Sequence, residues 1–180
     1  MFVIIAAVGK NGELGKRGGL IWHLPEDLKY FKEITRDGNV VMGVKTLRSL
    51  PGLLLGRKHY IVTRHKAETE RIVKTMQQDF RDKHPKMELP EVEIIDEVDD
   101  FIERWQNAPE KFFICGGGEI YRRFLPSTKE LYLTEIEDED KKADAFFPFF
   151  DKTRYNKTII KKGKQNDLEY QFVLYTKNNK

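Results

Sequence analysis

The stretch Phe2-Val-Ile-Ile-Ala-Ala-Val8 decides the fold class of this chain. Its residues are continuously apolar and partly β-branched, and the run stops at Gly9. Strands of a parallel sheet have this pattern, because helices cover both of their faces. The run is too short to cross a bilayer, and no basic residue precedes it as in a secretory signal. It therefore predicts a buried strand in the centre of an α/β fold.

Outward from this strand, predicted strands and helices alternate along most of the chain. Strands are expected at 39–42, 58–63, 92–95, 112–115 and 131–136. Helices are expected from Pro25 onward, at 44–50, at 66–83, after a cap at Asp96, and at 119–125. The last predicted feature is a hairpin of 158–162 and 168–175. This order predicts a single α/β domain over residues 1–180, with a mostly parallel central sheet, flanking helices and an antiparallel C-terminal hairpin.

The segment 66–90 is the one candidate for an insertion. It is highly charged, although Ile72, Val73, Met76 and Phe80 form an apolar stripe at helical spacing. We expect a solvated, peripheral helix without a catalytic role. Deletion of most of this segment should then leave the Michaelis constants unchanged.

Composition excludes several classes of function. The 32 basic and 29 acidic residues leave a net charge of +3, which is too balanced to indicate nucleic-acid binding. The single cysteine, Cys115, cannot form an intramolecular disulfide, so a cytoplasmic protein is expected. Cys115 and the four histidines lack metal-ligand spacing, and no metal site is expected. Walker and nucleophile-elbow motifs are also absent from the sequence.

Two glycine-rich segments are suited to close contact between backbone and ligand. From Gly9 to Gly19, glycines punctuate the sequence as in a mobile loop. Gly116-Gly117-Gly118 joins a predicted strand to a predicted helix, where free N–H groups and the helix dipole attract anions. The triplet does not match the G-x-G-x-x-G fingerprint, and a lone glycine triplet is more often a tight turn than a phosphate site. Thr46 and the pair Thr63-Arg64 are similarly ambiguous phosphate contacts.

Asp27 is the most informative single residue. On a helical wheel centred on Asp27, Phe31 falls at about 40° and Ile34 at about 340°, whereas Glu26 falls at about 260°. Asp27 therefore lies on the apolar face, and Glu26 lies on the solvated one. Both acids could simply favour a helix N-terminus. A carboxylate directed at a core, however, needs a partner or an altered pKa, which makes Asp27 a candidate functional residue.

Six segments, in order, resemble the dihydrofolate reductase family. Trp22-His-Leu-Pro-Glu-Asp-Leu-Lys-Tyr-Phe-Lys32 looks like its W-x-L-P-x-D-L-x-x-F-K motif. The other matches are Ile5-Ala6-Ala7, Met42-Gly43-x-x-Thr46 with Ser49, Gly56-Arg57-Lys58, Gly116-Gly117-Gly118-x-Ile120-Tyr121, and Leu131-Tyr-Leu-Thr134 with the later Asp144 and Phe147-Pro148. Together they span residues 1 to about 150, and the C-terminal hairpin carries no motif. The resemblance implies a dihydrofolate-reductase-like fold.

The same resemblance implies an enzyme that reduces dihydrofolate to tetrahydrofolate with NADPH, supports one-carbon metabolism, binds antifolates and acts as a monomer. Asp27 would hydrogen-bond N3 and the 2-amino group of the pterin and promote protonation at N5, supported by Thr134. Trp22 would hold a water near the site and close loop 9–23 over the cofactor. Arg57 would pair with the α-carboxylate of the glutamate tail. The residues implied to contact the substrate rings are Ile5, Leu28, Phe31, Leu50, Leu54 and Cys115.

For NADPH, the resemblance implies that glycines and helix starts bind the pyrophosphate. Arg64, with Lys45 and Thr63 nearby, would supply positive charge for the 2′-phosphate and so favour NADPH over NADH. The residues implied in cofactor binding are Ala7, Leu14, Gly15, Leu20, Gly43, Lys45, Thr46, Thr63, Arg64, Gly116, Gly117, Gly118, Glu119, Ile120 and Tyr121.

Departures from the family pattern and three alternatives remain. Val44 stands where many members have a basic residue, and Leu55 stands where a proline usually precedes Gly-Arg. A related pyrimidine reductase of riboflavin synthesis would share the fold but lack the combination of Trp22 and Asp27. A non-catalytic nucleotide- or pterin-binding module is disfavoured by an acid on an apolar face. A basic RNA-binding domain is disfavoured by the balanced charge.

Overall fold

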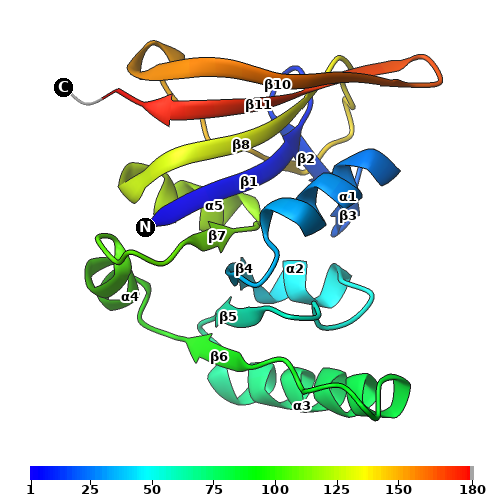
Figure 1. Ribbon diagram of the computed structural model, residues 1–180, viewed down its shortest axis with the longest axis vertical. Helices are drawn as coiled ribbons and strands as arrows, with labels where there is room; N and C mark the ends of the chain where they lie inside the picture. The colour runs from blue at the N-terminus through cyan, green and yellow to red at the C-terminus, as the bar shows by residue number, and fades with distance from the viewer. Residues whose placement is uncertain (179–180) are drawn as a thin grey trace.

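The computed structural model describes residues 1–178, which form an eight-stranded sheet flanked by helices (Figure 1). In spatial order the strands are β10 (Tyr155–Gln165), β11 (Leu168–Lys177), β8 (Thr128–Ile136), β1 (Phe2–Val8), β7 (Phe112–Ile114), β4 (Asn39–Gly43), β5 (Lys58–Val62) and β6 (Val92–Ile95). The six strands from β8 to β6 are parallel, and β11 and β10 complete the sheet in antiparallel pairing. The predicted α/β class and C-terminal hairpin are therefore confirmed.

The central strand β1 contributes to the hydrophobic core on both faces of the sheet. Phe2, Ile4 and Ala6 pack into one cluster, and Val3 and Ile5 pack into the other. This alternation follows from the two-residue period of a strand. The continuous apolar run predicted a strand with two buried faces, and all of Phe2–Val8 except the partly exposed Ala7 is buried.

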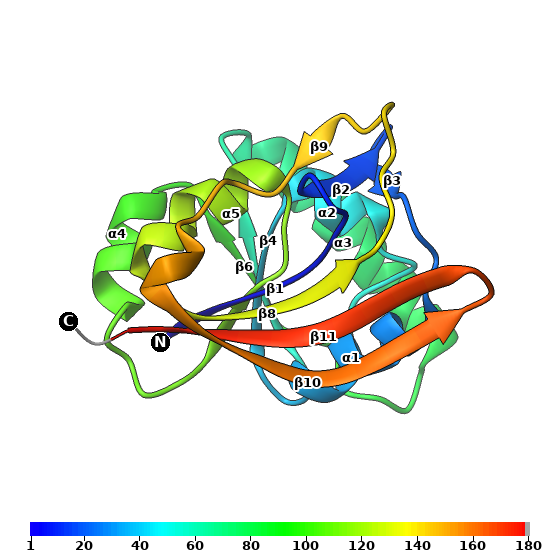
Figure 2. The same cartoon turned by 90° about the horizontal axis from the view of Figure 1, so that it is seen from above.

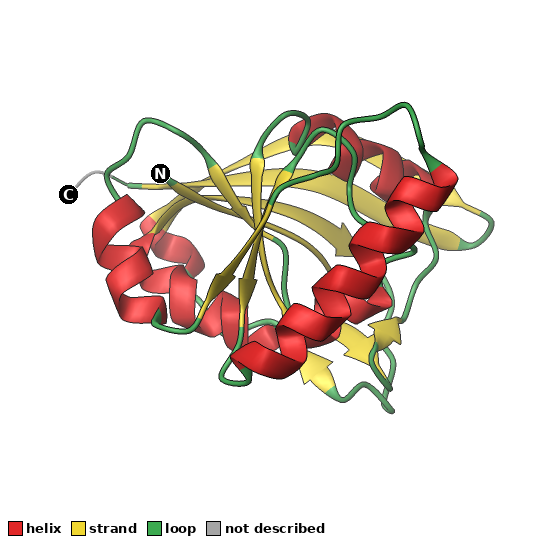
Figure 3. Cartoon of the chain, turned by 90° about the horizontal axis from the view of Figure 1, so that it is seen from below, coloured by secondary structure: helices red, strands yellow, loops and turns green. Residues whose placement is uncertain are grey.

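Helices lie on both sides of the sheet (Figure 3). One group, α1 (Pro25–Ile34), α2 (Val44–Ser49) and α3 (Lys66–Lys83), packs on the face of Val3 and Ile5. The other group, α4 (Val98–Trp105) and α5 (Gly118–Phe124), packs on the opposite face, and short 3-10 turns follow at Leu125–Ser127 and Lys152–Arg154. Within the described residues, no helix is both long enough and apolar enough to cross a membrane.

Helix α3 covers residues 66–83 of the segment for which we expected a solvated, peripheral helix. This helix is the crossover that joins parallel strands β5 and β6, and such a connection cannot be a short turn. Val73 and Phe80 are buried in the same core cluster as Val3 and Ile5. Charged residues dominate the composition of this segment, and a narrow apolar stripe is enough to bury one side of the helix.

The glycine-rich loop also differs from expectation, because it contains strands. β2 (Glu13–Lys16) and β3 (Gly19–Leu20) form a three-stranded sheet with β9 (Ala145–Phe146), beside the carboxyl end of β1 (Figure 2). A Cβ at Gly15 would lie 2.7 Å from the Gly19 carbonyl oxygen, so this hairpin requires a glycine there. The pairing with β9 is between segments far apart in sequence, and periodicity does not detect such pairings.

Two smaller expectations are also corrected. Helix α4 begins after Glu97 with no side-chain cap, and the Asp96 carboxylate instead accepts from Lys66 Nζ at 3.3 Å. The C-terminal hairpin is longer than expected, with β10 starting at Tyr155, because the exposed lysines of this edge strand hide its period. Charged side chains on an edge strand discourage pairing with other chains.

Candidate functional site

The candidate site lies at the carboxyl edge of the parallel strands, where the chain connections change sides. Strands β1 and β7 are neighbours, but β1 leads to α1 on one face and β7 leads to α5 on the other. Crevices at such switch points are the usual ligand sites of open α/β sheets. Ala7, Gly43 and Cys115 lie at or just beyond the ends of β1, β4 and β7.

Asp27 lies in the first turn of α1, which starts at Pro25. Its carboxylate is half-buried and accepts a hydrogen bond of 2.6 Å from Thr134 Oγ1 on β8. Burial raises the pKa of Asp27, and the hydrogen bond from Thr134 opposes that rise. Among the described residues, no cation pairs with it. The helical-wheel argument therefore placed Asp27 correctly, with an unneutralised carboxylate facing the sheet.

The helical wheel placed Glu26 on the solvated face, but this side chain has partners within the protein. Its carboxylate accepts hydrogen bonds from the Tyr170 hydroxyl and from Lys161 Nζ on the C-terminal hairpin. These bonds hold the first turn of α1 against β10 and β11. Asp27 and Glu26 therefore face different parts of the structure, and only Asp27 faces Thr134.

Five of the residues expected at the substrate rings belong to one apolar cluster. The cluster contains the buried Ile5 together with Phe31, Leu50, Leu54 and Cys115. Burial raises the pKa of the Cys115 thiol to about 12, so the thiol stays protonated and acts as an apolar surface. Leu28 differs from the other predicted ring contacts, because it is 37% exposed and lies outside this cluster.

Arg57 is held against the C-terminal end of α1 with part of its guanidinium free. Nε donates to the carbonyl and hydroxyl of Thr35, one terminal nitrogen donates to the Leu55 carbonyl, and the other donates to the Lys32 carbonyl. A guanidinium has five N–H groups, so one N–H remains on each terminal nitrogen. These two donors form a fork that suits a carboxylate.

The glycine turn brings together residues from three parts of the chain. Gly116 has φ +124°, which favours glycine, and its carbonyl accepts the Gly43 amide at 2.9 Å. A Cβ at Gly116 would lie 3.3 Å from the Tyr121 hydroxyl and 3.5 Å from Thr46 Oγ1. The Tyr121 hydroxyl donates to the Ile5 carbonyl at 2.8 Å. The glycine turn at Gly116 therefore lies in contact with Gly43, Thr46 and Tyr121.

Other predicted cofactor contacts take varied positions. Gly117 lies close to Thr46, and a Cβ at Gly118 would lie 2.7 Å from the Phe146 carbonyl oxygen of β9. Ile120 packs beside Gly43. Glu119 is instead turned to solvent and paired with Arg122, which does not support a contact role.

Trp22 makes a contact that the sequence did not predict. Its Nε1 donates to Asp138 Oδ2 at 2.9 Å, and its ring lies over Gly9. This bond ties the start of α1 to the acidic loop after β8. Leu14 packs against the core and Gly15 is buried in β2, whereas Leu20 is 68% exposed.

The predicted phosphate contacts divide into exposed and occupied groups. Lys45 and Arg64 are exposed, and neither forms an ion pair within the described residues. Thr63 is buried, and its hydroxyl oxygen accepts from the His65 amide and the Thr69 hydroxyl, each at 3.0 Å. Its lone pairs therefore stabilise the turn after β5.

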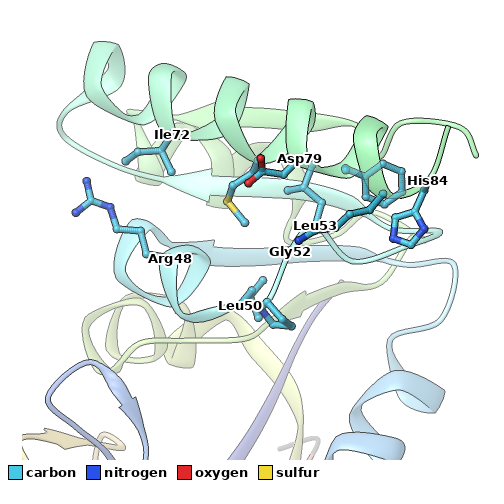
Figure 4. A pocket seen from close by; sticks show the side chains of 11 residues that line it. Arg48, Leu50, Gly52, Leu53, Ile72, Asp79 and His84 are labelled. Atoms are coloured by element: carbon cyan, nitrogen blue, oxygen red, sulfur yellow. The ribbon is translucent and has the colours of Figure 1, made fainter.

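A cavity of about 270 Å³ lies between α3 and the loop that follows α2 (Figure 4). Leu50 and Leu53 line one side, and Ile72 and Phe80 of α3 line the other. Of the residues predicted for the site, Leu50 alone belongs to this lining. Leu53, Ile72 and Phe80 belong to the same apolar cluster as Leu50, so the cavity borders that cluster.

Comparison with known proteins gives a consistent result. The family model described as "Dihydrofolate reductase" matches residues 1–83 and 80–177. Dihydrofolate reductase of Bacillus subtilis (strain 168) is 30% identical over 99% of this chain and 96% of its own length. That of Enterococcus faecium is 31% identical over 100% and 99%. A solved Enterococcus faecalis dihydrofolate reductase, complexed with NADP(H) and RAB-propyl, has a TM-score of 0.73 at 24% identity, covering 99% of this chain and 97% of that one.

Proposed function

This chain belongs to the dihydrofolate reductase family, and from that premise we propose how its residues reduce 7,8-dihydrofolate to 5,6,7,8-tetrahydrofolate with NADPH. The observation that carries the proposal is the half-buried Asp27 carboxylate, bonded to Thr134 and lacking a cation among the described residues. In the reaction a hydride adds to C6 of the pterin and a proton adds to N5. NADPH supplies the hydride from C4 of its nicotinamide.

Asp27 binds and orients the pterin. A carboxylate accepts two N–H groups from a planar amidine edge, namely N3 and the 2-amino group. Because no cation among residues 1–178 pairs with Asp27, a ligand with two donors satisfies its lone pairs and offsets its desolvation. Thr134 fixes which oxygen remains available. The carboxylate also stabilises positive charge on the bound pterin, which promotes proton delivery to N5.

The apolar cluster and Arg57 bind the rest of the substrate. Phe31, Leu50 and Leu54 provide a surface for the pterin and benzoyl rings. The two free N–H groups of Arg57 pair with the α-carboxylate of the glutamate tail. Two of the carbonyls that hold Arg57, those of Lys32 and Thr35, come from the C-terminal end of α1, so this helix helps to position both Asp27 and Arg57.

The glycine turn fits a dinucleotide. Gly116 has φ +124°, which favours glycine, and a Cβ there would lie 3.3 Å from the Tyr121 hydroxyl. We place the pyrophosphate beside Gly116 and Thr46, and the 2′-phosphate beside Arg64 and Lys45. The exposed cations favour NADPH over NADH, because they offer positive charge to the additional phosphate.

Trp22 closes the segment 9–23 over the cofactor in this proposal. Its bond to Asp138 holds the segment that precedes α1 near the end of β8. We further propose that the enzyme acts in the cytoplasm as a monomer, supplies tetrahydrofolate for one-carbon metabolism, and is inhibited by antifolates.

The test is absorbance at 340 nm with NADPH and dihydrofolate, with and without a diaminopyrimidine antifolate. We expect a decrease that requires dihydrofolate and is abolished by the antifolate. A folded protein that binds NADPH but does not oxidise it with dihydrofolate would contradict the proposal. Turnover of a ribosylaminopyrimidine would then indicate the related pyrimidine reductase, and its absence would indicate a binding module.

A further inference from the structure

His59 is a buried histidine outside the site described so far. It lies in β5, is 0% exposed, and its Nε2 accepts the backbone N–H of Leu54 at 3.0 Å. A ring nitrogen that accepts a hydrogen bond carries no proton, so the imidazole is neutral with its proton on Nδ1. Buried polar side chains are nearly always hydrogen-bonded, so the bond between His59 and the loop backbone fixes their relative position.

The loop between α2 and β5 has few other restraints. Of the backbone amides from Gly52 to Gly56, only that of Leu54 donates a hydrogen bond within the described part of the chain. On the α3 side the loop borders the cavity of about 270 Å³, so packing does not fill that side (Figure 4). The loop between Pro51 and Arg57 is therefore held at the Leu54 amide by His59, at the Leu55 carbonyl by Arg57, and by the buried Leu53 side chain.

We propose that neutral His59 is a positioning residue for substrate binding. By holding the Leu54 amide, it sets the position of Leu54 relative to Arg57, whose guanidinium donates to carbonyls at the end of α1 and to the Leu55 carbonyl. The ring-binding surface and the tail-binding cation then keep a constant separation before substrate arrives. This inference rests on the proposed function, which places rings at Leu54 and a carboxylate at Arg57.

The electrostatics of the site agree with a neutral imidazole. Burial lowers the pKa of His59 to about 4, and the positive charge of Arg57 acts in the same direction. Hydrogen bonding to the backbone of Glu91 opposes the change without overcoming it. His59 therefore remains an acceptor throughout the neutral range.

The test compares two variants of the same residue. His59→Leu removes the acceptor, and His59→Gln restores an oxygen at about the reach of Nε2. We expect His59→Leu to raise the KM for dihydrofolate about tenfold, with kcat and the NADPH Kd within about threefold of the parent. His59→Gln should return the KM to within about threefold. Ile61→Val, a buried change on the same strand, controls for general destabilisation and should leave the KM unchanged.

Amide hydrogen exchange gives a readout that does not depend on activity. We expect the Leu54 amide of the parent protein to exchange more slowly than those of Gly52 and Leu55, and this protection to be lost in His59→Leu and kept in His59→Gln. An unchanged KM in folded His59→Leu, or an equal KM increase in both variants, would overturn the proposal. So would an unprotected Leu54 amide in the parent, even if His59→Leu fails to fold. Absence of turnover in the parent would instead count against the proposed function alone.

Discussion

Asp27 and Thr134 form a pair whose two effects on acidity oppose each other. Burial of the carboxylate favours its protonated form, whereas the hydroxyl of Thr134 donates to the carboxylate and favours the charged form. The net result is a raised pKa. Thr134 is therefore the residue that limits how far the acidity of Asp27 is weakened.

Thr134→Val should shift the apparent pKa of catalysis upward, because the Thr134 hydrogen bond, which lowers the pKa of Asp27, is removed. We expect turnover near pH 7 to change by about tenfold, equivalent to ~1.4 kcal/mol, which is typical of one hydrogen bond to a charged group. The measurement is the pH dependence of kcat. The matched control is Thr128→Val on the same strand, which removes a hydroxyl bonded to the Phe124 carbonyl. Equal pH profiles for both variants would contradict the assignment.

At the residue scale, sequence reasoning succeeded where a local pattern was sufficient. The helical wheel placed Asp27 toward the sheet because Phe31 and Ile34 defined the inner face. It did not find Asp138 or His59, because each acts through a partner defined only by the tertiary structure. Nothing in the spacing of Trp22 and Asp138 signals their contact, which brings together segments from either end of the chain.

At the scale of elements, α3 shows how composition can conceal a core helix. Only Thr69, Val73 and Phe80 are buried among its 18 residues, yet they cover the sheet beside β5 and β6. The stripe was visible in the sequence, but its partner strands were not. The earlier expectation that residues 66–90 can be deleted is accordingly replaced: a chain without them should fail to fold.

Phe80→Ala should lower the free energy of unfolding by about 3–5 kcal/mol, because a buried ring is replaced by a cavity beside one that already exists. Chemical denaturation monitored by circular dichroism measures the difference. Glu70→Ala, at an exposed position of the same helix, should change stability by no more than about 0.5 kcal/mol. Similar small effects for both substitutions would indicate that α3 is peripheral after all.

The C-terminal hairpin depends on a second carboxylate, Glu135 of β8. It accepts hydrogen bonds from Lys157 of β10 and from Gln171 and Tyr175 of β11. Although burial acts in the opposite direction, these partners lower the pKa of Glu135 to about 2. A carboxyl group whose pKa is lowered by folding stabilises the folded state at pH values above its unfolded-state pKa of 4.5. This contribution is lost as the pH falls toward about 2.

Glu135→Gln should therefore lower the Tm at pH 7 by roughly 2–4 °C for each ~1 kcal/mol of hydrogen bonding lost. The difference in Tm between Glu135→Gln and the parent protein should become smaller as the pH falls from about 4.5 toward 2. Thermal melts across this range provide the measurement. A Tm difference that stays constant with pH would show that the charge of Glu135 is not what stabilises the hairpin.

At the scale of the whole molecule, the order of strands and helices was predictable, whereas their pairing was not. Alternating apolar runs and amphipathic segments indicated a parallel sheet, and the structure confirms it. The position of β1 between β7 and β8, which creates the switch point at the site, depends on contacts between distant segments. The same reason explains why the small sheet of β2, β3 and β9 was missed. Local sequence thus predicted the elements, and the family motifs assigned candidate site residues to them.

The measurement that tests this account most directly is turnover of Asp27→Asn at pH 7, with NADPH affinity and Tm determined on the same sample. A raised pKa means that the charged carboxylate of Asp27 is disfavoured in the native state. The free energy of unfolding therefore declines as the pH rises from the unfolded-state pKa through the native-state pKa. The neutral amide should therefore keep or raise the Tm and leave NADPH binding unchanged. Turnover should fall by about 10²-fold or more, as expected when a group that promotes proton transfer is lost. Near-normal turnover in a folded Asp27→Asn protein would contradict the central role assigned to this carboxylate.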